Sequence, residues 1–279
     1  MRTSALVVIL LPALATLSGC ATGTLSYQHS APAKSDPGNE IVQDDLQFET
    51  SIPVHISEDK KTIYSMGTTI KESHLAFDEP VFGDLDLYKV KFPISGTHVL
   101  KDCIATWTLV PGLHGDTNDP SDADQRVEGN VIIFAPSGSI QWAFGGGFGD
   151  DFGEVKAFPI LGFIWQASPR SKLTALVPLV KYEYTNAAGN KYNVAVVPEG
   201  AEWTWKAGAV GNQYPANIAL SGIKTTIGVD FLRGGNSYYF INAGIITNRK
   251  VEVSRADDPS VNGSLELQSV WVAQVGLRW

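Results

Sequence analysis

Apolar and polar residues alternate along the last stretch of the chain, residues 265–279. Apolar side chains occupy mostly the odd positions there, and the even positions include Glu266 and Arg278. Because successive side chains of a β-strand point to opposite faces, this period of two predicts a strand with one apolar and one polar face. Trp271 and Trp279 share the apolar face, separated by about the 9–11 residues with which a strand crosses a bilayer. We therefore expect them to mark the two interfaces of a membrane.

The same alternation runs through most of the chain from residue 46 onward. Turn sequences interrupt it, and Pro136-Ser137-Gly138 and Arg233-Gly234-Gly235-Asn236 are typical of tight hairpins. The pattern predicts about twelve strands, at residues 46–56, 62–71, 85–94, 102–110, 127–135, 139–147, 158–165, 172–184, 192–205, 218–231, 237–247 and 265–279. An even number of crossings returns the C-terminus to the side on which the first strand begins.

The predicted fold is all-β, an antiparallel up-and-down transmembrane-type β-barrel over residues 46–279. Outside the N-terminus no apolar run approaches about 18 residues, so only a closed barrel is expected to span a membrane. Segments 131–134, 158–161 and 176–180 are apolar on both faces, which fits a narrow barrel filled by its own side chains or a soluble two-sheet protein. The predicted strand count conflicts with one rule of barrel architecture. The count places the long loop 111–126 on the periplasmic side, where barrels have short turns.

The N-terminus predicts export and lipidation. Arg2 precedes an apolar run, and Leu17-Ser18-Gly19-Cys20 follows where a signal peptide would be cleaved. This spacing is similar to the lipobox of bacterial lipoproteins, which implies a signal peptide at residues 1–19, acylation of Cys20 and localisation to the outer membrane. Residues 20–45 contain Pro32 and Pro37 and little periodicity, so we expect a flexible tether there.

Composition and net charge limit the classes of binding partner that we expect. The net charge is −8 and no basic stripe is present, so nucleic acid is not an expected partner. With Cys20 acylated, Cys103 has no partner for an intramolecular disulfide, and its apolar surroundings indicate a small packed residue.

A stretch of a little under half of the chain resembles an uncharacterised family of bacterial outer-membrane β-barrels, known as a domain of unknown function. The residues that carry the resemblance are Trp107, Pro111-Gly112, Asp116, Gly129, Pro159-Ile160-Leu161-Gly162, Trp165, Leu176-Val177-Pro178, Tyr182 and Tyr184. Residues 265–279 likewise resemble the closing strand of such barrels, which ends in an aromatic residue. The resemblance implies outer-membrane lipid and the barrel-assembly machinery as partners. It implies no catalytic residues.

Candidate chemistry is sparse. An acidic loop holds the weak metal candidates Asp116, Asp119, Asp122 and Asp124, but Pro120-Ser121 breaks the alternate ligand spacing of a calcium loop, and a solvated acidic loop is the preferred interpretation. The same holds for Asp150, Asp151 and Glu154. His55, His74, His98 and His114 are candidate members of a hydrolase site, but none lies in a nucleophile motif, and His98 and His114 are expected in solvated turns. We expect no metal, no cofactor and no enzyme activity.

Trp203 and Trp205 lie on one face of a predicted strand. They fit an aromatic girdle, or alternatively a hydrophobic ligand site. The sequence as a whole predicts an outer-membrane β-barrel lipoprotein with a structural, pore or lipid or small-molecule binding role. A soluble, lipid-tethered periplasmic β-domain that binds a ligand or partner is the alternative, and a barrel lipid hydrolase is the third.

Overall fold

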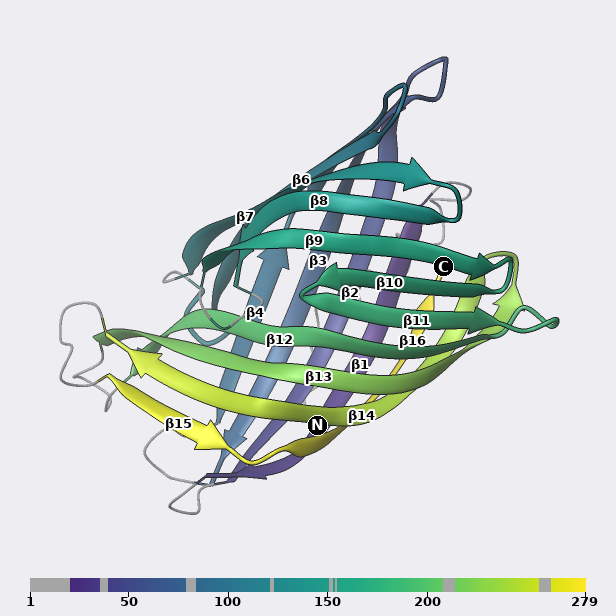
Figure 1. Cartoon of the computed structure of the whole chain (residues 1–279). Helices are drawn as coiled ribbons and strands as arrows, with labels where there is room; N and C mark the ends of the chain where they lie inside the picture. Colours follow the sequence, from purple (N-terminus) through teal and green to yellow (C-terminus); the bar gives the residue numbers. More distant parts are fainter. Residues whose placement is uncertain are drawn as a thin grey trace.

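The fold was analysed in a computed structural model that describes residues 21–35, 40–78, 84–120, 123–150, 153, 155–207, 214–255 and 262–279. The signal peptide, Cys20, Asp122, Asp151 and Glu154 lie outside these residues. The described chain consists of β-strands joined by turns (Figure 1). Among the described residues, no helix has the length and apolar character needed to cross a membrane.

Sixteen strands form one closed antiparallel barrel. They are β1 (Thr22–Lys34), β2 (Glu40–Ile56), β3 (Thr62–Phe77), β4 (Leu85–Lys91), β5 (Ile94–Val99), β6 (Ile104–Asp116), β7 (Asp124–Ser137), β8 (Ile140–Gly149), β9 (Lys156–Ser168), β10 (Ser171–Val177), β11 (Leu179–Thr185), β12 (Lys191–Ala207), β13 (Tyr214–Gly234), β14 (Ser237–Ser254), β15 (Gly263–Leu267) and β16 (Val270–Arg278). β1 pairs with both β2 and β16, and β16 pairs with β14, which closes the ring. β4 and β5 share one position between β3 and β6, and β15 pairs only with β14, so the wall has 14 strands.

The predicted count of twelve is therefore wrong by two strands, and the predicted tether is wrong as well. Residues 22–34 form β1, and Pro32 is accommodated at a register shift between Ser30 and Ala33, where a missing N–H disturbs no ladder. The predicted strand 172–184 is in fact the hairpin of β10 and β11, which turns at Val177-Pro178.

These two additional strands resolve the conflict over the loops. Both ends of the barrel wall, Thr22 and Arg278, lie together with the short connections 57–61, 100–103, 138–139, 169–170, 186–190 and 235–236, an end called here the terminus end. The strand ends at Lys34, Phe77, Asp116, Gly149, Ala207 and Ser254 lie at the opposite end, called the loop end, and five to eight residues separate each of them from the next strand. Short turns beside the termini and longer loops opposite them are typical of bacterial outer-membrane barrels.

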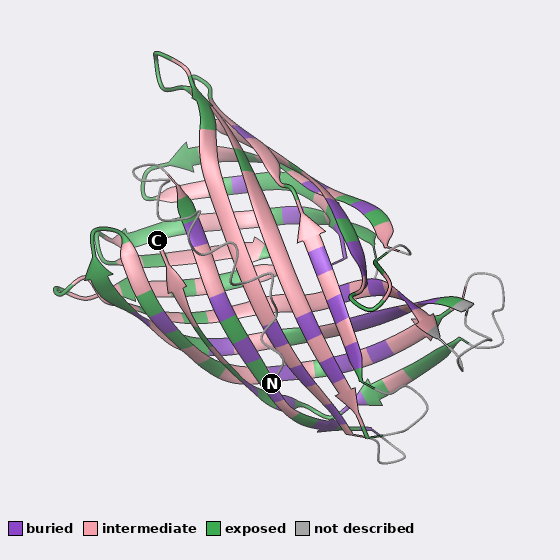
Figure 2. Ribbon diagram, turned by 180° about the vertical axis from the view of Figure 1, so that it is seen from behind, coloured by how far each residue is buried: buried purple, intermediate pink, exposed green. Residues whose placement is uncertain are grey.

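The outward face of the barrel is apolar. In β16 the exposed residues Trp271 and Val275 alternate with the buried Val270 and Val272, so the predicted two-faced strand is confirmed with its apolar face outward. In Figure 2 buried and exposed residues alternate along several strands of the barrel. Other exposed apolar residues of the wall include Val131, Ile133, Trp142, Phe144, Leu161, Trp165, Val177, Val180, Tyr182, Val194, Ile227, Phe231, Tyr239 and Ile241.

The interior near the loop end is filled by an apolar cluster from both the first and the last strands. Its members are Ala33, Ile41, Leu75, Leu85, Leu87, Ala201, Trp203, Trp205, Ala216, Ile218, Leu220, Ile246, Val251, Leu267, Val270 and Val272. Residues from opposite sides of the ring can meet in this way only where the wall is drawn together. The barrel is therefore packed with its own side chains at the loop end.

Candidate functional site

The site begins with an interruption of the wall. β11 pairs with β12 only as far as Val180 and Val196, although β12 continues to Ala207. Likewise β9 pairs with β10 only from Leu161 onward, although β9 begins at Lys156. Residues 156–160 of β9 and 197–207 of β12 thus lack a neighbouring strand on the facing edges. We call this interval the wall gap.

The far half of β12 contacts β6. The backbone N–H of Glu202 donates to Asp150 Oδ2 at 3.2 Å, and the Glu202 carbonyl accepts from His114 Nδ1 at 3.2 Å. Because a carbonyl can only accept, Nδ1 of His114 carries the proton. Both backbone groups of Glu202 bond away from β13. His114 and Asp150 therefore replace the missing strand at this point of the β12 edge.

Side chains strengthen the same attachment. The Glu202 carboxylate accepts from Arg126 Nη1 at 2.6 Å, and Arg126 Nε donates to Asp124 at 3.0 Å. Lys206 forms an ion pair with Asp119 near the loop end. Residues of β12 are thereby joined to β7 and to the β6–β7 connection. We call these side-chain contacts of Glu202 and Lys206 the clamp.

Two lysines balance the acidic groups beneath the clamp. Lys89 forms a buried ion pair with Asp150, and Lys91 Nζ lies 2.6 Å from Glu128 and 3.7 Å from Asp150. The Lys89 ammonium also lies 5.1 Å from the ring centroid of Trp203. Burial opposes ionisation of Asp150, which lies just beyond β8, but the two ammonium groups outweigh it and lower the pKa of this carboxyl. The cluster is consequently an ionised, largely compensated network.

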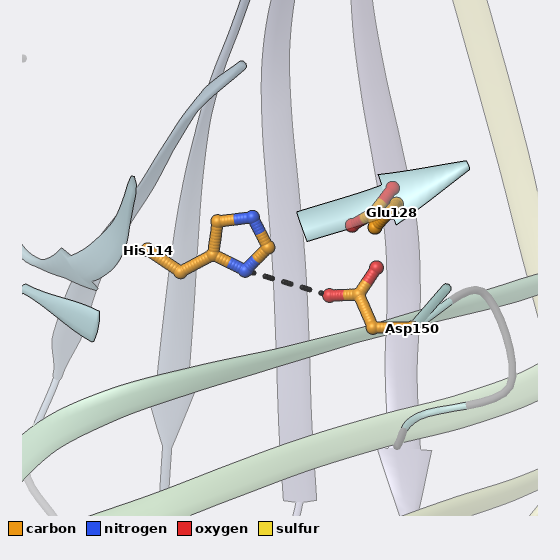
Figure 3. Close-up of side chains that lie close together, drawn as sticks. All are labelled: His114, Glu128 and Asp150. Carbon is orange, nitrogen blue, oxygen red and sulfur yellow. Dashed lines mark ion pairs between the residues drawn. The ribbon is translucent and has the colours of Figure 1, made fainter. Parts of the chain in front are cut away.

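His114, Glu128 and Asp150 are arranged so that one ligand atom from each lies within 4.8 Å of the others (Figure 3). Zinc is commonly held by such donors. Here, however, Lys89 and Lys91 already bind the carboxylates, and a divalent cation would leave two buried ammonium groups without partners. The residues present therefore do not fit a metal ion.

A second polar layer spans the barrel nearer the terminus end. Asp45 pairs with Lys71 at 3.0 Å, Lys224 pairs with Glu199 at 3.0 Å, and Arg249 Nη2 donates to Gln43 at 2.6 Å. The two ion pairs join neighbouring strands, β2 with β3 and β12 with β13, and the Arg249–Gln43 bond links β14 to β2. The charged side chains of this layer thus have polar partners beneath the apolar cluster.

The acidic residues predicted as weak metal candidates are not brought together. Asp116 accepts from the backbone and side chain of Asn118, Asp119 pairs with Lys206, and Asp124 pairs with Arg126. Each described carboxylate thus serves a different local partner, and Asp122 lies outside the described residues.

The tryptophans divide into two groups. Trp271 is 72% exposed on the outer face, and the ring of Trp279 stacks on Phe48 with centroids 6.3 Å apart. Trp203 is 0% exposed and Trp205 is almost as deeply buried, so their assignment to a girdle is wrong. The reason is that the far half of β12, still paired with β13, contacts β6, and the shared face of these two rings lies in the interior cluster.

The histidines do not form one site. His74 lies 2.7 Å from Asp86, and His98 is 3.4 Å from the indole nitrogen of Trp107. The predicted solvated turns at His98 and His114 are wrong, because both residues lie in strands and His114 is fully buried. Cys103 is half-buried in the β5–β6 connection.

Sequence reasoning missed Lys89, Lys91, Glu128, Arg126 and Glu202 as members of a cluster. A signal was present, because charged residues at intervals of two on otherwise apolar strands indicate an inward polar face. Their partners lie far away in sequence, and the alternation of a single strand cannot identify them.

No family model matches the chain, and no curated protein matches it. The resemblance to an uncharacterised family therefore stays a prediction. Similar solved structures include the beta domain of the Bordetella autotransporter BrkA, with 9% identity, 94% of this chain and 99% of that chain covered, and a TM-score of 0.35. The deltaS2 mutant of the TodX monoaromatic hydrocarbon channel has 9% identity, 93% and 89% coverage and a TM-score of 0.44.

The translocator domain of the autotransporter NalP from Neisseria meningitidis has 9% identity, 98% and 94% coverage and a TM-score of 0.30. We transfer no residue or activity from these proteins. The barrel itself is established by the strand pairing of this chain.

Proposed function

We propose that this protein is an outer-membrane β-barrel whose lumen is closed by its own β12, with a structural or lipid-binding role in the envelope. The observation that carries the proposal is the distribution of side chains: the outer face is apolar, and ion pairs such as Lys89–Asp150 and Lys71–Asp45 point inward. A soluble barrel would rarely expose an apolar surface of this extent. The nine residues of β16 match the length of a membrane-crossing strand, about 9–11 residues.

The turn lengths support an orientation. Outer-membrane barrels place short turns in the periplasm, so the terminus end of this barrel would face the periplasm. β1 begins at Thr22, two positions after Cys20. An acylated Cys20 would therefore insert its chains in the inner leaflet beside Trp279, and the C-terminal strand β16 would be the segment read by the barrel-assembly machinery.

The filled interior favours a closed barrel over an open pore. The clamp and the apolar cluster occupy the lumen at the loop end, whereas a cavity of about 680 Å³ at the terminus end is lined by residues that include Lys191, Tyr238 and Arg278. The proposal includes no catalytic step. His114 faces Asp150, as a catalytic histidine faces a carboxylate, but its Nε2 has no hydrogen-bond partner among the described residues.

The decisive experiment separates an inserted barrel from a tethered soluble domain. A Cys20→Ser variant is exported with an ordinary cleavable signal, which removes the anchor. We expect it to remain in the outer-membrane fraction, to require detergent for extraction, and to migrate faster on gels before boiling than after. A folded variant released in soluble form would contradict insertion and favour the tethered periplasmic domain.

A further inference from the structure

Arg249 of β14 is a buried cation without an acidic partner of its own. The residue is 3% exposed, and its guanidinium forms no ion pair with any carboxylate of the described residues. Its Nη2 donates to the neutral side-chain amide of Gln43 at 2.6 Å, whereas its Nη1 is buried and has no hydrogen-bond partner among these residues. Burying an ionised group without a counter-charge is costly, so the surroundings of Arg249 lack a component.

The second polar layer accordingly carries one excess positive charge. Its two ion pairs, Asp45–Lys71 and Glu199–Lys224, each match one carboxylate with one ammonium group. Both carboxylates attract Arg249, but each is already bound by its own lysine. The neighbouring network beneath the clamp is balanced, with the cations Lys89, Lys91 and Arg126 and the largely buried carboxylates Asp150, Glu128 and Glu202. The unmatched charge of these two layers is therefore that of Arg249.

A β-bulge directs the Arg249 side chain into the lumen. The register of β13 and β14 shifts at Gly222, so this one residue faces both Asn248 and Arg249 of β14. Asn248 has a φ of 51°, a left-handed conformation that is uncommon for residues other than glycine. Before the bulge the buried Ile246 faces inward, and after it Arg249 and the buried Val251 do. The bulge thus changes which residues of β14 point inward, as bulges beside functional sites often do.

Arg249 borders a small cavity in the lumen. The cavity has a volume of about 20 Å³, and its lining includes Trp203, Lys71, Glu199 and Ser221 besides Arg249. Nε1 of the fully buried Trp203 has no hydrogen-bond partner among the described residues either. Because indole and guanidinium N–H groups can only donate, both atoms require an acceptor. A cavity of this size holds a single small species, such as one water molecule or one monoatomic ion.

We propose that this cavity binds a monoatomic halide ion, such as chloride, between Arg249 Nη1 and Trp203 Nε1. The ion gives both donors an acceptor and makes the layer electrically neutral. The Glu199 carboxylate opposes an anion, but Lys224 lies 3.0 Å from it and compensates its charge. A water molecule in the same place would accept from both donors and leave the excess charge of Arg249 unbalanced.

The halide would connect two strands of the lumen wall. Trp203 belongs to β12 and Arg249 to β14, and β13 lies between these strands in the sheet. A ligand that binds only the folded barrel raises its stability in proportion to occupancy. The ion would therefore stabilise the inward position of the far half of β12 together with the clamp. Since the site lies inside the lumen, it does not depend on membrane insertion, and either idea can fail without the other.

Thermal unfolding of the full chain in detergent micelles tests the halide site. Sodium gluconate is replaced stepwise by sodium chloride or sodium bromide at constant sodium concentration, because gluconate is too large for a cavity of about 20 Å³. We expect the unfolding midpoint to rise with either halide and then to saturate. Trp203→Phe keeps an aromatic ring and removes the donor, so the chloride concentration that gives half of the increase should rise about tenfold or more. Trp271→Phe, on the exposed outer face, is the matched control and should keep the parent response.

Arg249→Gln can still bond to Gln43 but has lost the charge, and it should show no halide-dependent increase. An equal midpoint in chloride and gluconate for the parent chain would overturn the site, as would a parent-like chloride response of Trp203→Phe or Arg249→Gln. A second measurement needs no variant to fold. Crystals of the parent chain grown with bromide should show anomalous density within hydrogen-bonding reach of both Arg249 Nη1 and Trp203 Nε1, and density there without an anomalous signal would identify a water molecule and refute the proposal.

Discussion

Removing the Glu202 side chain should open the lumen. The Glu202→Ala substitution deletes the partner of Arg126 Nη1, 2.6 Å away, in a pair whose side chains are only 7% and 15% exposed. Arg126 keeps Asp124 as a partner, and the backbone of residue 202 can still bond to His114 and Asp150. The loss is therefore smaller than that of an entire buried ion pair, and we expect about 2–3 kcal/mol.

A free-energy loss of this size is enough to shift the equilibrium between the clamped and the released position of β12. A loss of about 2.7 kcal/mol changes the ratio of clamped to released β12 by roughly a hundredfold. In planar bilayers the parent protein should be silent, and Glu202→Ala should show discrete conductance events. The matched control is Glu252→Ala, which removes an exposed pair with Lys250 worth about 0–1 kcal/mol and should stay silent. A folded, inserted Glu202→Ala protein without any conductance would refute the view that the clamp closes the lumen.

Two buried side chains of the barrel interior and the predicted acylation of Cys20 give three further predictions. Asp150→Asn leaves Lys89 buried without its counter-ion, so the midpoint of denaturant unfolding in detergent should fall by the equivalent of about 3–5 kcal/mol, and an unchanged midpoint would contradict the buried pair. Trp203→Ala should cost about 3–5 kcal/mol in the same assay, whereas Trp271→Ala should cost much less because that ring faces outward. Metabolic labelling with palmitate should mark the parent chain and not Cys20→Ser, and equal labelling of both would exclude acylation at this residue.

The sequence was most informative where each face of a strand meets a different environment. β16 has outward apolar residues and an inward Arg278 that pairs with Asp230, so its alternation predicted both its conformation and its two faces. β1 was not predicted because Pro32 and Pro37 argue against a strand, although a proline at a register shift, such as Pro32, breaks no ladder. The β10–β11 hairpin was missed because its turn interrupts a continuous apolar run at Pro178 alone.

The surroundings of the inward face of β12 could not be predicted from the local sequence pattern. Trp203 and Trp205 at an interval of two establish that the rings share a face, and the same spacing fits a girdle or a core. What that face meets is decided by contacts distant in sequence, such as Glu202 with His114 and Asp150 with Lys89. Periodicity determines the direction of side chains, but the surroundings of a strand depend on the closed ring.

A single displacement of β12 accounts for both the clamp and the wall gap. The far half of β12 contacts β6, and residues 156–160 of β9, which pair with β8, have no strand on their other edge. The two features should therefore change together. In a Glu202→Ala protein that carries a spin label at position 160 in a Cys20→Ser, Cys103→Ala background, release of β12 should raise the accessibility of the label to a water-soluble nickel chelate as conductance appears, because water then reaches the inward face of β9. A Gly129→Ala substitution, which adds a Cβ 3.3 Å from the Phe148 ring and outside the clamp, should leave conductance absent. If conductance appeared while the label at position 160 stayed shielded from nickel, the clamp and the gap would be separate irregularities of the wall.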